Sequence, residues 1–548
     1  MSASTTVHRH ANTGRPTGSP LTGTVVLTRF LLRRDRVKLP AWVGGLGVFV
    51  LYIGAALPQL APTEDDLDAM SPLLAQPVGR MFTGPAFGMD DPTYERFFAA
   101  GYAPYLFLLA GLMNIMLVTR HTRVEEQTGR AELLRANVTG RHTALTATMV
   151  VATITNLLAA LVVVVLAVAN GFAPTGSVLV GAATGLTGMA FAGVTATTVQ
   201  LSEYSRTAAG MAGMVLGASF ALRAVGDMAG VGGTALSWAS PLGWPAQTAP
   251  YVHDRWAPLL LLVACAAVTT VAAFVLQARR DFGASLIAAR PGPAHARPSL
   301  GSPLGLAARL QRGGLLGWGT GILVLGVVDG AFTQAMVDAG EDMPPALQEM
   351  FAAGGLVDGY ANFLGAFVTI LVTAYTVFAL QTLRSEEGSG RAEAVLATPI
   401  TRASWLGSHV AAIAAGALLI TLLTGIGTGL AAALVTGEGD LAREMVVAHL
   451  ALLPAAWFVL GLGAALLGIA PRLMAGICWA LVVVIGVVEF FASLLDLPDW
   501  ITTLSPMGHL PAYPVEELEV QPGVVTVVLA LVLVGAGLAG LRRRQINA

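Results

Sequence analysis

Two charged segments of the chain carry the same residues in the same order. Residues 123–132 read Arg-Val-Glu-Glu-Gln-Thr-Gly-Arg-Ala-Glu, and residues 384–393 read Arg-Ser-Glu-Glu-Gly-Ser-Gly-Arg-Ala-Glu. Their identical residues are separated by a constant offset of 261, which also relates Ala136 to Ala397 and Arg141 to Arg402. So many charged identities at one spacing indicate a duplication.

The charged side chains of these segments allow two kinds of interaction. Glu126–Arg130 and Glu387–Arg391 have the i, i+4 spacing of exposed helical ion pairs, each worth about 0.2–0.5 kcal/mol, but such pairs do not explain the repetition. Glycine weakens a helix by about 1 kcal/mol relative to alanine, which favours a break and then a short, separate helix. Two such helices are suited to docking a symmetric partner. The docking candidates are Glu125, Glu126, Gly129, Arg130, Glu132, Glu386, Glu387, Gly390, Arg391 and Glu393.

No catalytic or metal-binding pattern accompanies these segments. An ATP-binding P-loop needs a lysine in G-x-x-x-x-G-K-[ST], and the only lysine, Lys38, lies in Arg-Asp-Arg-Val-Lys-Leu-Pro. The chain also lacks H-E-x-x-H and G-x-S-x-G, and Cys265 and Cys478 lie in separate apolar runs. We therefore expect no catalytic residue, metal site or cofactor in this chain.

The elements that position the charged segments are membrane helices. The chain is 55% hydrophobic and 12% charged, against about 25% charged residues in soluble domains. About 20 apolar residues cross a bilayer as a helix, which predicts an all-α integral membrane protein of about twelve spans. The predicted spans are 41–60, 101–119, 144–170, 177–201, 207–226, 257–277, 314–335, 359–383, 407–436, 446–470, 474–495 and 523–541.

The arginines predict the orientation of these spans, because basic residues stay on the cytoplasmic side. With the N-terminus inside, 26 of the 31 Lys and Arg residues fall on cytoplasmic segments. We therefore expect both termini and both duplicated segments to be cytoplasmic. The loops 60–98, 336–358 and 496–522 are then external.

Further matches extend the duplication over the whole chain. Arg33, Arg36 and Trp42 recur as Arg309, Arg312 and Trp318, and Ser-Pro-Leu-Gly at 240–243 recurs as Ser-Pro-Met-Gly at 505–508. Six spans per copy is an even number, so the two repeats are expected to be parallel. The predicted organisation is a disordered cytoplasmic tail (1–20), a first six-helix repeat (21–287), a cytoplasmic linker (288–303) and a second six-helix repeat (304–548).

A few polar and aromatic residues within the spans are candidates for a ligand path. Glu489 lies near the outer end of its span, where snorkelling to the interface is the favoured interpretation over a specific role. Asn114 is a candidate for a hydrogen bond between helices. For most of the aromatic and Met residues, ordinary packing or contact with lipid is the favoured interpretation. The candidate path residues are Phe107, Met113, Asn114, Met214, Phe220, Phe363, Phe367, Phe378, Trp479, Glu489 and Phe490.

The duplicated segments carry a resemblance to a known family. An acidic pair, a glycine, a Glu, apolar residues and then Thr-Arg resemble the coupling-helix loop of ABC-2 type transporter membrane subunits. The double length, the basic lead-ins and the Gly-Ser-Pro-Leu-Gly-Leu segment at 301–306 make the chain similar to the polyketide-antibiotic (tetronasin-type) exporter permeases of high-GC bacteria. The first copy departs from the pattern at Asn137-Val138, where the second has Thr398-Pro399.

This resemblance implies a type V ABC exporter-like fold in a bacterial plasma membrane. It also implies that two copies of an ABC ATPase subunit, which bind ATP and Mg, dock below the duplicated loops. The lead-ins would lie along the inner membrane surface, and 240–243 and 505–508 would form external re-entrant elements. Hydrophobic or amphipathic compounds such as antibiotics would be exported between the halves. The expected partners are this ATPase, membrane lipid and the substrate, with no nucleic acid.

Two other classes of function remain as alternatives. A proton-coupled secondary transporter also has twelve spans in two halves, but it needs carboxylates near mid-membrane, which these spans essentially lack. A membrane scaffold or enzyme would perform no transport, and no catalytic pattern supports an enzyme. Co-purification with an ATPase would separate the ABC exporter from both.

Overall fold

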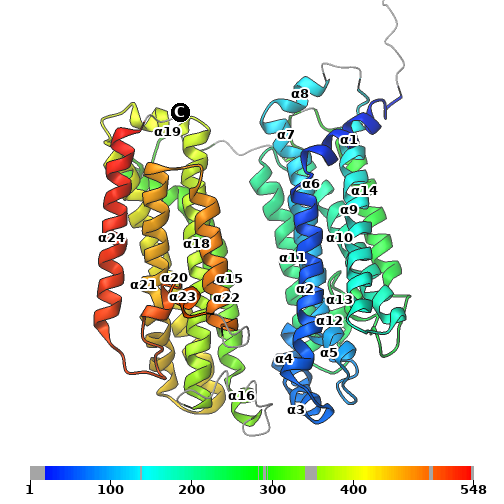
Figure 1. Ribbon diagram of the computed structural model, residues 1–548. Helices are drawn as coiled ribbons and strands as arrows, with labels where there is room; N and C mark the ends of the chain where they lie inside the picture. Colours follow the sequence, from blue (N-terminus) through cyan, green and yellow to red (C-terminus); the bar gives the residue numbers. More distant parts are fainter. Residues whose placement is uncertain are drawn as a thin grey trace, which may run out of the picture. The chain divides into compact units, whose positions relative to one another are not determined.

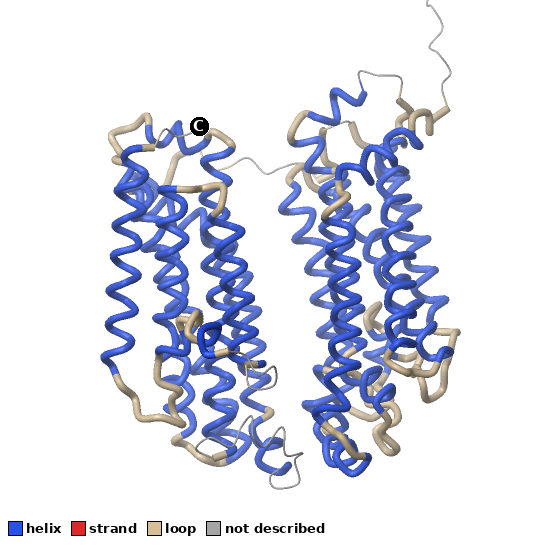
Figure 2. Tube along the Cα trace, in the orientation of Figure 1, coloured by secondary structure: helices blue, strands red, loops and turns tan. Residues whose placement is uncertain are grey.

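The computed structural model describes residues 19–135, 139–281, 283–287, 292, 294–339, 355–492 and 498–544. All regular elements within these ranges are helices (Figure 2). Eleven of these helices are long and apolar enough to cross a bilayer, and a twelfth apolar helix, Met474–Phe490, is shorter. The chain is therefore a multi-pass membrane protein of about twelve helices, as its composition predicted.

The chain divides into two compact units, Met1–Pro291 and Gly292–Ala548. Unit 1 (blue to green in Figure 1) contains α1 (Thr24–Arg34), α2 (Lys38–Leu60), α3 (Glu64–Ala75), α4 (Pro77–Phe82), α5 (Tyr94–Gly101), α6 (Ala103–His121), α7 (Arg123–Gln127), α8 (Arg130–Arg135), α9 (Thr143–Ala169), α10 (Pro174–Leu201), α11 (Ser205–Met228), α12 (Ala235–Trp238), α13 (Gly243–Ala246) and α14 (Leu259–Arg279).

Unit 2 (green to red in Figure 1) begins with a 3-10 turn and has fewer short helices among its described residues. It contains η1 (Pro298–Gly301), α15 (Pro303–Ala331), α16 (Thr333–Ala339), α18 (Leu356–Gly388), α19 (Arg391–Leu396), α20 (Arg402–Thr436), α21 (Leu441–Ile469), α22 (Met474–Phe491), α23 (Asp499–Thr502), η3 (Met507–His509) and α24 (Val520–Arg543).

The long helices of the two units pack according to the same plan. In unit 1, α10 packs against α6, α9, α11 and α14, while α2 packs against α9. In unit 2, α21 packs against α18, α20, α22 and α24, while α15 packs against α20. Taken in chain order, these contacts of unit 1 thus recur between the counterpart helices of unit 2. This shared packing accompanies the repeated sequence motifs.

Small residues bring the central helix of unit 2 close to its neighbour α24. A Cβ added at Gly468 would lie 2.1 Å from the carbonyl oxygen of Gly537, and one added at Gly537 would lie 2.3 Å from that of Ala464. A Cβ at Gly461 would lie 2.6 Å from the Ala530 oxygen. The two backbones therefore pack directly against each other, with no room for a side chain between them.

The lead-in segments differ between the units. In unit 1, α1 ends at Arg34 and α2 starts at Lys38, so the lead-in is a separate helix; in unit 2, the lead-in is the first part of the continuous helix α15. The difference lies at Asp35, whose carboxylate pairs with Arg120 (2.8 Å) and His121 (2.9 Å) of α6. The matching residue, Gln311, donates instead to the Ala379 carbonyl (3.1 Å) from within α15. The lead-in of unit 2 is therefore not a separate helix.

Several expectations lie partly or wholly outside the described residues. They concern most of the tail 1–20, part of the linker 288–303, and Ala136, Asn137 and Val138 of the first duplicated segment. They also concern most of the loop 336–358 and the end of the predicted span 474–495, since α22 ends at Phe491.

Candidate functional site

The first duplicated segment is held to the end of the last long helix of its unit by a cluster of ionic contacts. The Glu126 carboxylate accepts from Arg123 (2.6 Å) and, through both oxygens, from Arg280 (2.6 and 3.1 Å). Arg123 is 1% exposed, and it also donates to the carbonyls of Val199 (2.9 Å) and Ala284 (3.2 Å). Residues from α7, α10 and the segment after α14 are thereby fixed together.

The second duplicated segment repeats this arrangement with its own residues. Glu387 accepts from Arg384 (3.1 Å) and from Arg544, which directly follows α24. The Glu387 side chain is 1% exposed, while that of Arg384 is 34% exposed. Each unit therefore uses the second glutamate of its acidic pair to join its loop to an arginine at the end of its last long helix.

The first glutamate of each acidic pair contacts the arginine that begins the following short helix. Arg391 donates to both oxygens of Glu386 (2.8 and 2.7 Å), and these hydrogen bonds raise the pKa of its guanidinium. Arg130 lies 3.5 Å from Glu125. The i, i+4 ion pairs Glu126–Arg130 and Glu387–Arg391, one interpretation of the sequence, were therefore wrong.

The glycines explain this change of partner. Gly129 has φ +72° and Gly390 has φ +74°, left-handed conformations that an L-residue adopts only at a cost of about 1–2 kcal/mol. The helix therefore breaks before α8 and α19, so the regular i, i+4 geometry across the glycine is lost. The break that the glycines predicted is confirmed.

The short helices α8 and α19 expose matching side chains. Ala131 and Ala392 are buried, whereas Glu132 and Glu393 are exposed. Among the described residues, neither of these two glutamates has a hydrogen-bond or ion-pair partner for its carboxylate. Each unit thus presents one unpaired acidic group, on a short helix fixed to the rest of the unit through the acidic pair before it.

Unit 1 has an additional chain of polar contacts that joins its loop to the lead-in helix. Arg34, the last residue of α1, contacts Glu125 (3.0 Å) and the Nδ1 atom of His121 (2.8 Å). His121 in turn contacts Asp35 (2.9 Å). In unit 2, the residues 261 positions after Arg120 and His121 are Gln381 and Thr382, so this chain belongs to the first loop alone.

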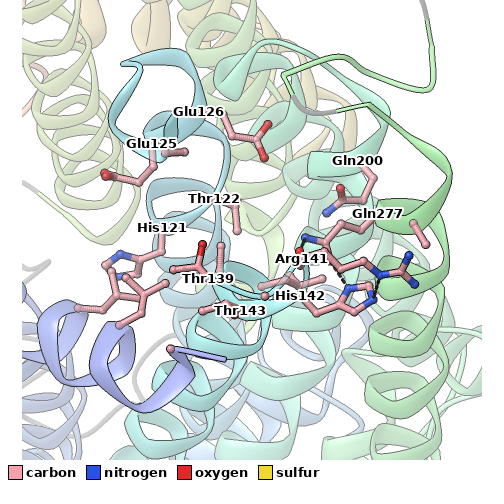
Figure 3. Close-up of a pocket in the computed structure, with 18 of the residues that line it drawn as sticks. His121, Thr122, Glu125, Glu126, Thr139, Arg141, His142, Thr143, Gln200 and Gln277 are labelled. Atoms are coloured by element: carbon pink, nitrogen blue, oxygen red, sulfur yellow. Dashed lines mark hydrogen bonds between the residues drawn. The ribbon is translucent and has the colours of Figure 1, made fainter. Parts of the chain in front are cut away.

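A pocket of about 620 Å³ lies beside the first loop. It is bounded by α1, the end of α6 with α7, the start of α9 and the end of α14 (Figure 3). Arg141 donates to the Nε2 atom of His142 (2.9 Å), and the His142 Nδ1 atom lies 3.1 Å from the side-chain oxygen of Gln277. Figure 3 shows these three side chains on the side of the pocket away from His121.

Three of the candidate path residues come together in unit 2. The rings of Phe363 and Phe490 have centroids 5.0 Å apart, and Phe367 lies 6.4 Å from Phe363 and 6.2 Å from Phe490. Phe378 is elsewhere on α18, 6.0 Å from Trp318. Trp479 packs partly buried against the core of the unit.

The candidate path residues of unit 1 have different surroundings. Phe107 and Met113 are each 1% exposed, whereas Met214 is 68% exposed. Phe220 lies under the guanidinium of Arg223, 4.7 Å from its ring centroid. A substrate path along all of these residues stays a prediction.

Asn114 forms the hydrogen bond between helices that the sequence predicted. Its side-chain amide exchanges two hydrogen bonds with that of Asn156 on α9, at 3.0 and 2.9 Å. The partly buried Glu489 accepts from Ser505 (2.7 Å), so it holds the Ser-Pro-Met-Gly segment to the end of α22. In unit 1, Asp227 of α11 accepts from Ser237 (2.6 Å) in a similar way.

The arginines at the ends of α14 and α24 were missed by sequence reasoning. Arg280 and Arg544 are related by an offset of 264, whereas the loops are related by 261. No single offset therefore aligns both the two loops and these two arginines. The available signal was an arginine directly after the last span of each half.

Comparison with known proteins identifies the family. The family model described as "Multidrug efflux system permease Rv1217c, C-terminal domain" matches residues 28–276 and 300–542. The chain belongs to this family. It is also 35% identical over 536 residues to the multidrug efflux system permease protein Rv1217c of Mycobacterium tuberculosis (strain ATCC 25618 / H37Rv), covering 97% of this chain and 96% of that relative. Both duplicated segments, called the acidic-pair loops below, lie within the matched ranges. Most of the pocket lies within or between these ranges, whereas its lining residues Gly23, Val26 and Leu27 precede the first.

Proposed function

We propose that this chain is the transmembrane subunit of an ATP-driven ABC exporter that moves hydrophobic or amphipathic compounds, including drugs and antibiotics, out of a bacterial cell. Its membership of a multidrug efflux permease family supports the transport role. The sequence lacks a P-loop lysine, so ATP and Mg would be bound by a separate ATPase chain. No catalytic role is assigned to this chain.

The observation that carries the ATPase assignment is the repeated architecture of the two acidic-pair loops. Each loop has a short helix after a left-handed glycine, an exposed unpaired glutamate on that helix, and an ionic contact to the last long helix of the unit. A pair of ATPase subunits would meet two equivalent surfaces. We therefore expect one copy of this chain to assemble with two ATPase subunits.

The ionic contacts suggest how movement of an ATPase would reach the membrane helices. A force on α8 passes through Glu125 and Glu126 to Arg280 at the end of α14, and one on α19 passes through Glu386 and Glu387 to Arg544 at the end of α24. The contacts of Glu126 with Arg280 and of Glu387 with Arg544 are largely buried, and they resist separation because loss of one partner leaves an unpaired charge. The last long helix of each unit would thus move with its loop.

Reversal of the exposed charges tests this coupling. The double variant Glu132→Arg, Glu393→Arg should insert normally, because both side chains are exposed and unpaired, but should lose ATPase association or substrate-stimulated hydrolysis. A basic surface on the partner would gain like-charge repulsion in place of attraction. The matched control is Glu438→Arg, an exposed reversal in the turn between α20 and α21.

The measurements are co-purification with the ATPase, ATPase stimulation and drug resistance of cells. We expect the control to behave as the unsubstituted protein in all three. If the double variant also retained association, stimulation and resistance at normal expression, the two short helices would be ordinary solvated surface and the coupling proposal would fail.

A further inference from the structure

The pocket beside the first acidic-pair loop has features that the docking role leaves unexplained. Its volume of about 620 Å³ lies within the range of small-molecule sites, about 300–1,000 Å³. Among its lining residues only the buried Ala131 belongs to α8, and Glu132 is not one of them. The pocket is therefore distinct from the exposed face assigned to docking.

The charges of the pocket leave a cation available to a ligand. Glu125 is shared by Arg34 and Arg130, and Glu126 by Arg123 and Arg280, so both carboxylates are neutralised. Arg141 uses only its Nε atom, in the hydrogen bond to His142. Within the described part of the chain, its two terminal nitrogens have no hydrogen-bond or ion-pair partner. Asp281, at the pocket edge, is the one lining carboxylate that no described arginine contacts.

The repeat shows that this free guanidinium is specific to the first unit. Arg402 occupies the position of Arg141 in the second duplicated segment, and it donates to the carbonyl oxygens of Leu541 (3.0 Å) and Arg544 at the end of α24. One terminal nitrogen of Arg402 is thus used within its own unit, in both of these hydrogen bonds. Arg141 instead lies in the pocket wall with its terminal nitrogens unused.

The other polar residues of the pocket are also absent from the second repeat. His142 corresponds to Ala403 at the offset of 261, and Gln277 corresponds to Leu541 at the offset of 264 that relates Arg280 to Arg544. In unit 1, His142 accepts from the Arg141 side chain, and Gln277 contacts His142 and the carbonyl oxygen of Arg141 (Figure 3). The polar residues of this pocket wall therefore belong to unit 1 and are not shared by the two repeats.

The opposite wall of the pocket is apolar. It is formed largely by α1, with Leu27 and Leu31 buried, and with Val26 (73% exposed) and Phe30 (50% exposed) at the surface. A ligand with an acid group at Arg141 would therefore meet apolar side chains beyond it. The apolar contact would continue from the pocket onto the exposed face of α1.

We propose that this pocket binds an anionic amphiphile, with its acid group at Arg141 and its chain against Leu27 and Phe30 of α1. A guanidinium recognises phosphate or carboxylate through paired hydrogen bonds, and basic pockets at the ends of membrane helices bind acidic lipid head groups. The two possible sources are an acidic phospholipid of the bilayer and a free fatty acid. The site does not depend on the proposed ATPase docking.

Native mass spectrometry of the purified full chain tests the site. The probes are dioleoyl phosphatidylglycerol, oleate and, as the uncharged-head comparison, dioleoyl phosphatidylcholine. Arg141→Gln should weaken binding of the anionic probe about tenfold, the effect of one lost charge-assisted contact. Ala278→Trp, which fills the pocket without changing its charge, should weaken the same binding.

The matched control is Arg206→Gln, which removes an exposed arginine at the start of α11, outside the pocket. Thermal unfolding of each variant in detergent identifies any loss of the fold. Arg141-dependent binding of phosphatidylglycerol or of oleate supports the site, and it shows whether the ligand is a phospholipid or a free fatty acid. The proposal is overturned if neither anionic probe depends on Arg141, if phosphatidylcholine binds equally, or if Arg206→Gln has the same effect as Arg141→Gln.

Discussion

Arg123 and Arg384 occupy the same position in the two acidic-pair loops but have different surroundings. Arg123 is 1% exposed and contacts Glu126 and two carbonyl groups, whereas the Arg384 side chain is 34% exposed and contacts Glu387. The duplicated residue is therefore a buried structural contact in unit 1 and a partly solvated ion pair in unit 2. Identical residues at a repeated position can therefore contribute differently to the free energy of unfolding.

This difference gives a prediction at the residue scale. Arg123→Gln should destabilise the chain by about 3 kcal/mol, because it leaves Glu126 with one partner and removes a buried guanidinium from its carbonyls. Arg384→Gln should cost about 1 kcal/mol or less, as expected for a partly exposed pair. Thermal unfolding of the two purified variants in the same detergent measures this, and equal shifts would contradict the structural difference.

At the scale of helices, the contact between α21 and α24 depends on the absence of side chains. Gly468, Gly461 and Gly537 each face a backbone carbonyl of the opposite helix at a distance too short for a Cβ. Interfaces of small residues allow membrane helices to approach closely and gain van der Waals contact. The last long helix, which carries Arg544 at its end, is positioned by this contact.

Two glycines on α24 provide a matched test of this packing. Gly537→Ala places a methyl group against the Ala464 carbonyl and should destabilise the chain by about 2 kcal/mol, as overpacking does. Gly535→Ala meets no atom within 4 Å and should be neutral or slightly stabilising, because alanine favours the helix. Thermal unfolding compares them, and a Gly537→Ala variant as stable as Gly535→Ala would show that the helices can separate freely.

At the scale of the whole molecule, the proposed function needs both acidic-pair loops on the cytoplasmic side. The arginine distribution predicts this, with the loops 60–98 and 496–522 outside. Single cysteines at Asp65 and Glu517, which are exposed, should then be reachable from outside the cell. Cysteines at Glu132 and Glu393 should be reachable only from inside.

The experiment uses an impermeant maleimide on intact and permeabilised cells, in a background with Cys265 and Cys478 replaced by alanine. We expect Asp65→Cys and Glu517→Cys to react in intact cells, and Glu132→Cys and Glu393→Cys to react only after permeabilisation. The reverse pattern would show that the topology is inverted. The acidic-pair loops would then lie outside the cell, where a cytoplasmic ATPase could not reach them.

The sequence by itself determined the number and approximate limits of the long helices, the duplication and the break at each loop glycine. These properties depend on neighbouring residues: a run of apolar side chains as long as a bilayer is thick, or a glycine that adopts a left-handed conformation. The sequence also correctly paired Asn114 with another helix, although it did not identify Asn156 as the partner.

Only the tertiary structure decided which charged groups meet. Glu126 contacts Arg280 and Glu387 contacts Arg544 across more than 150 residues, and the local spacing that favoured Arg130 and Arg391 was misleading. The pocket at Arg141 and the exposure of Met214 beside the burial of Phe107 likewise depend on which helix faces pack together. Such contacts join residues that are far apart in the chain. Helix periodicity predicts the face of a helix on which a side chain lies, but it does not predict which other helix packs against that face.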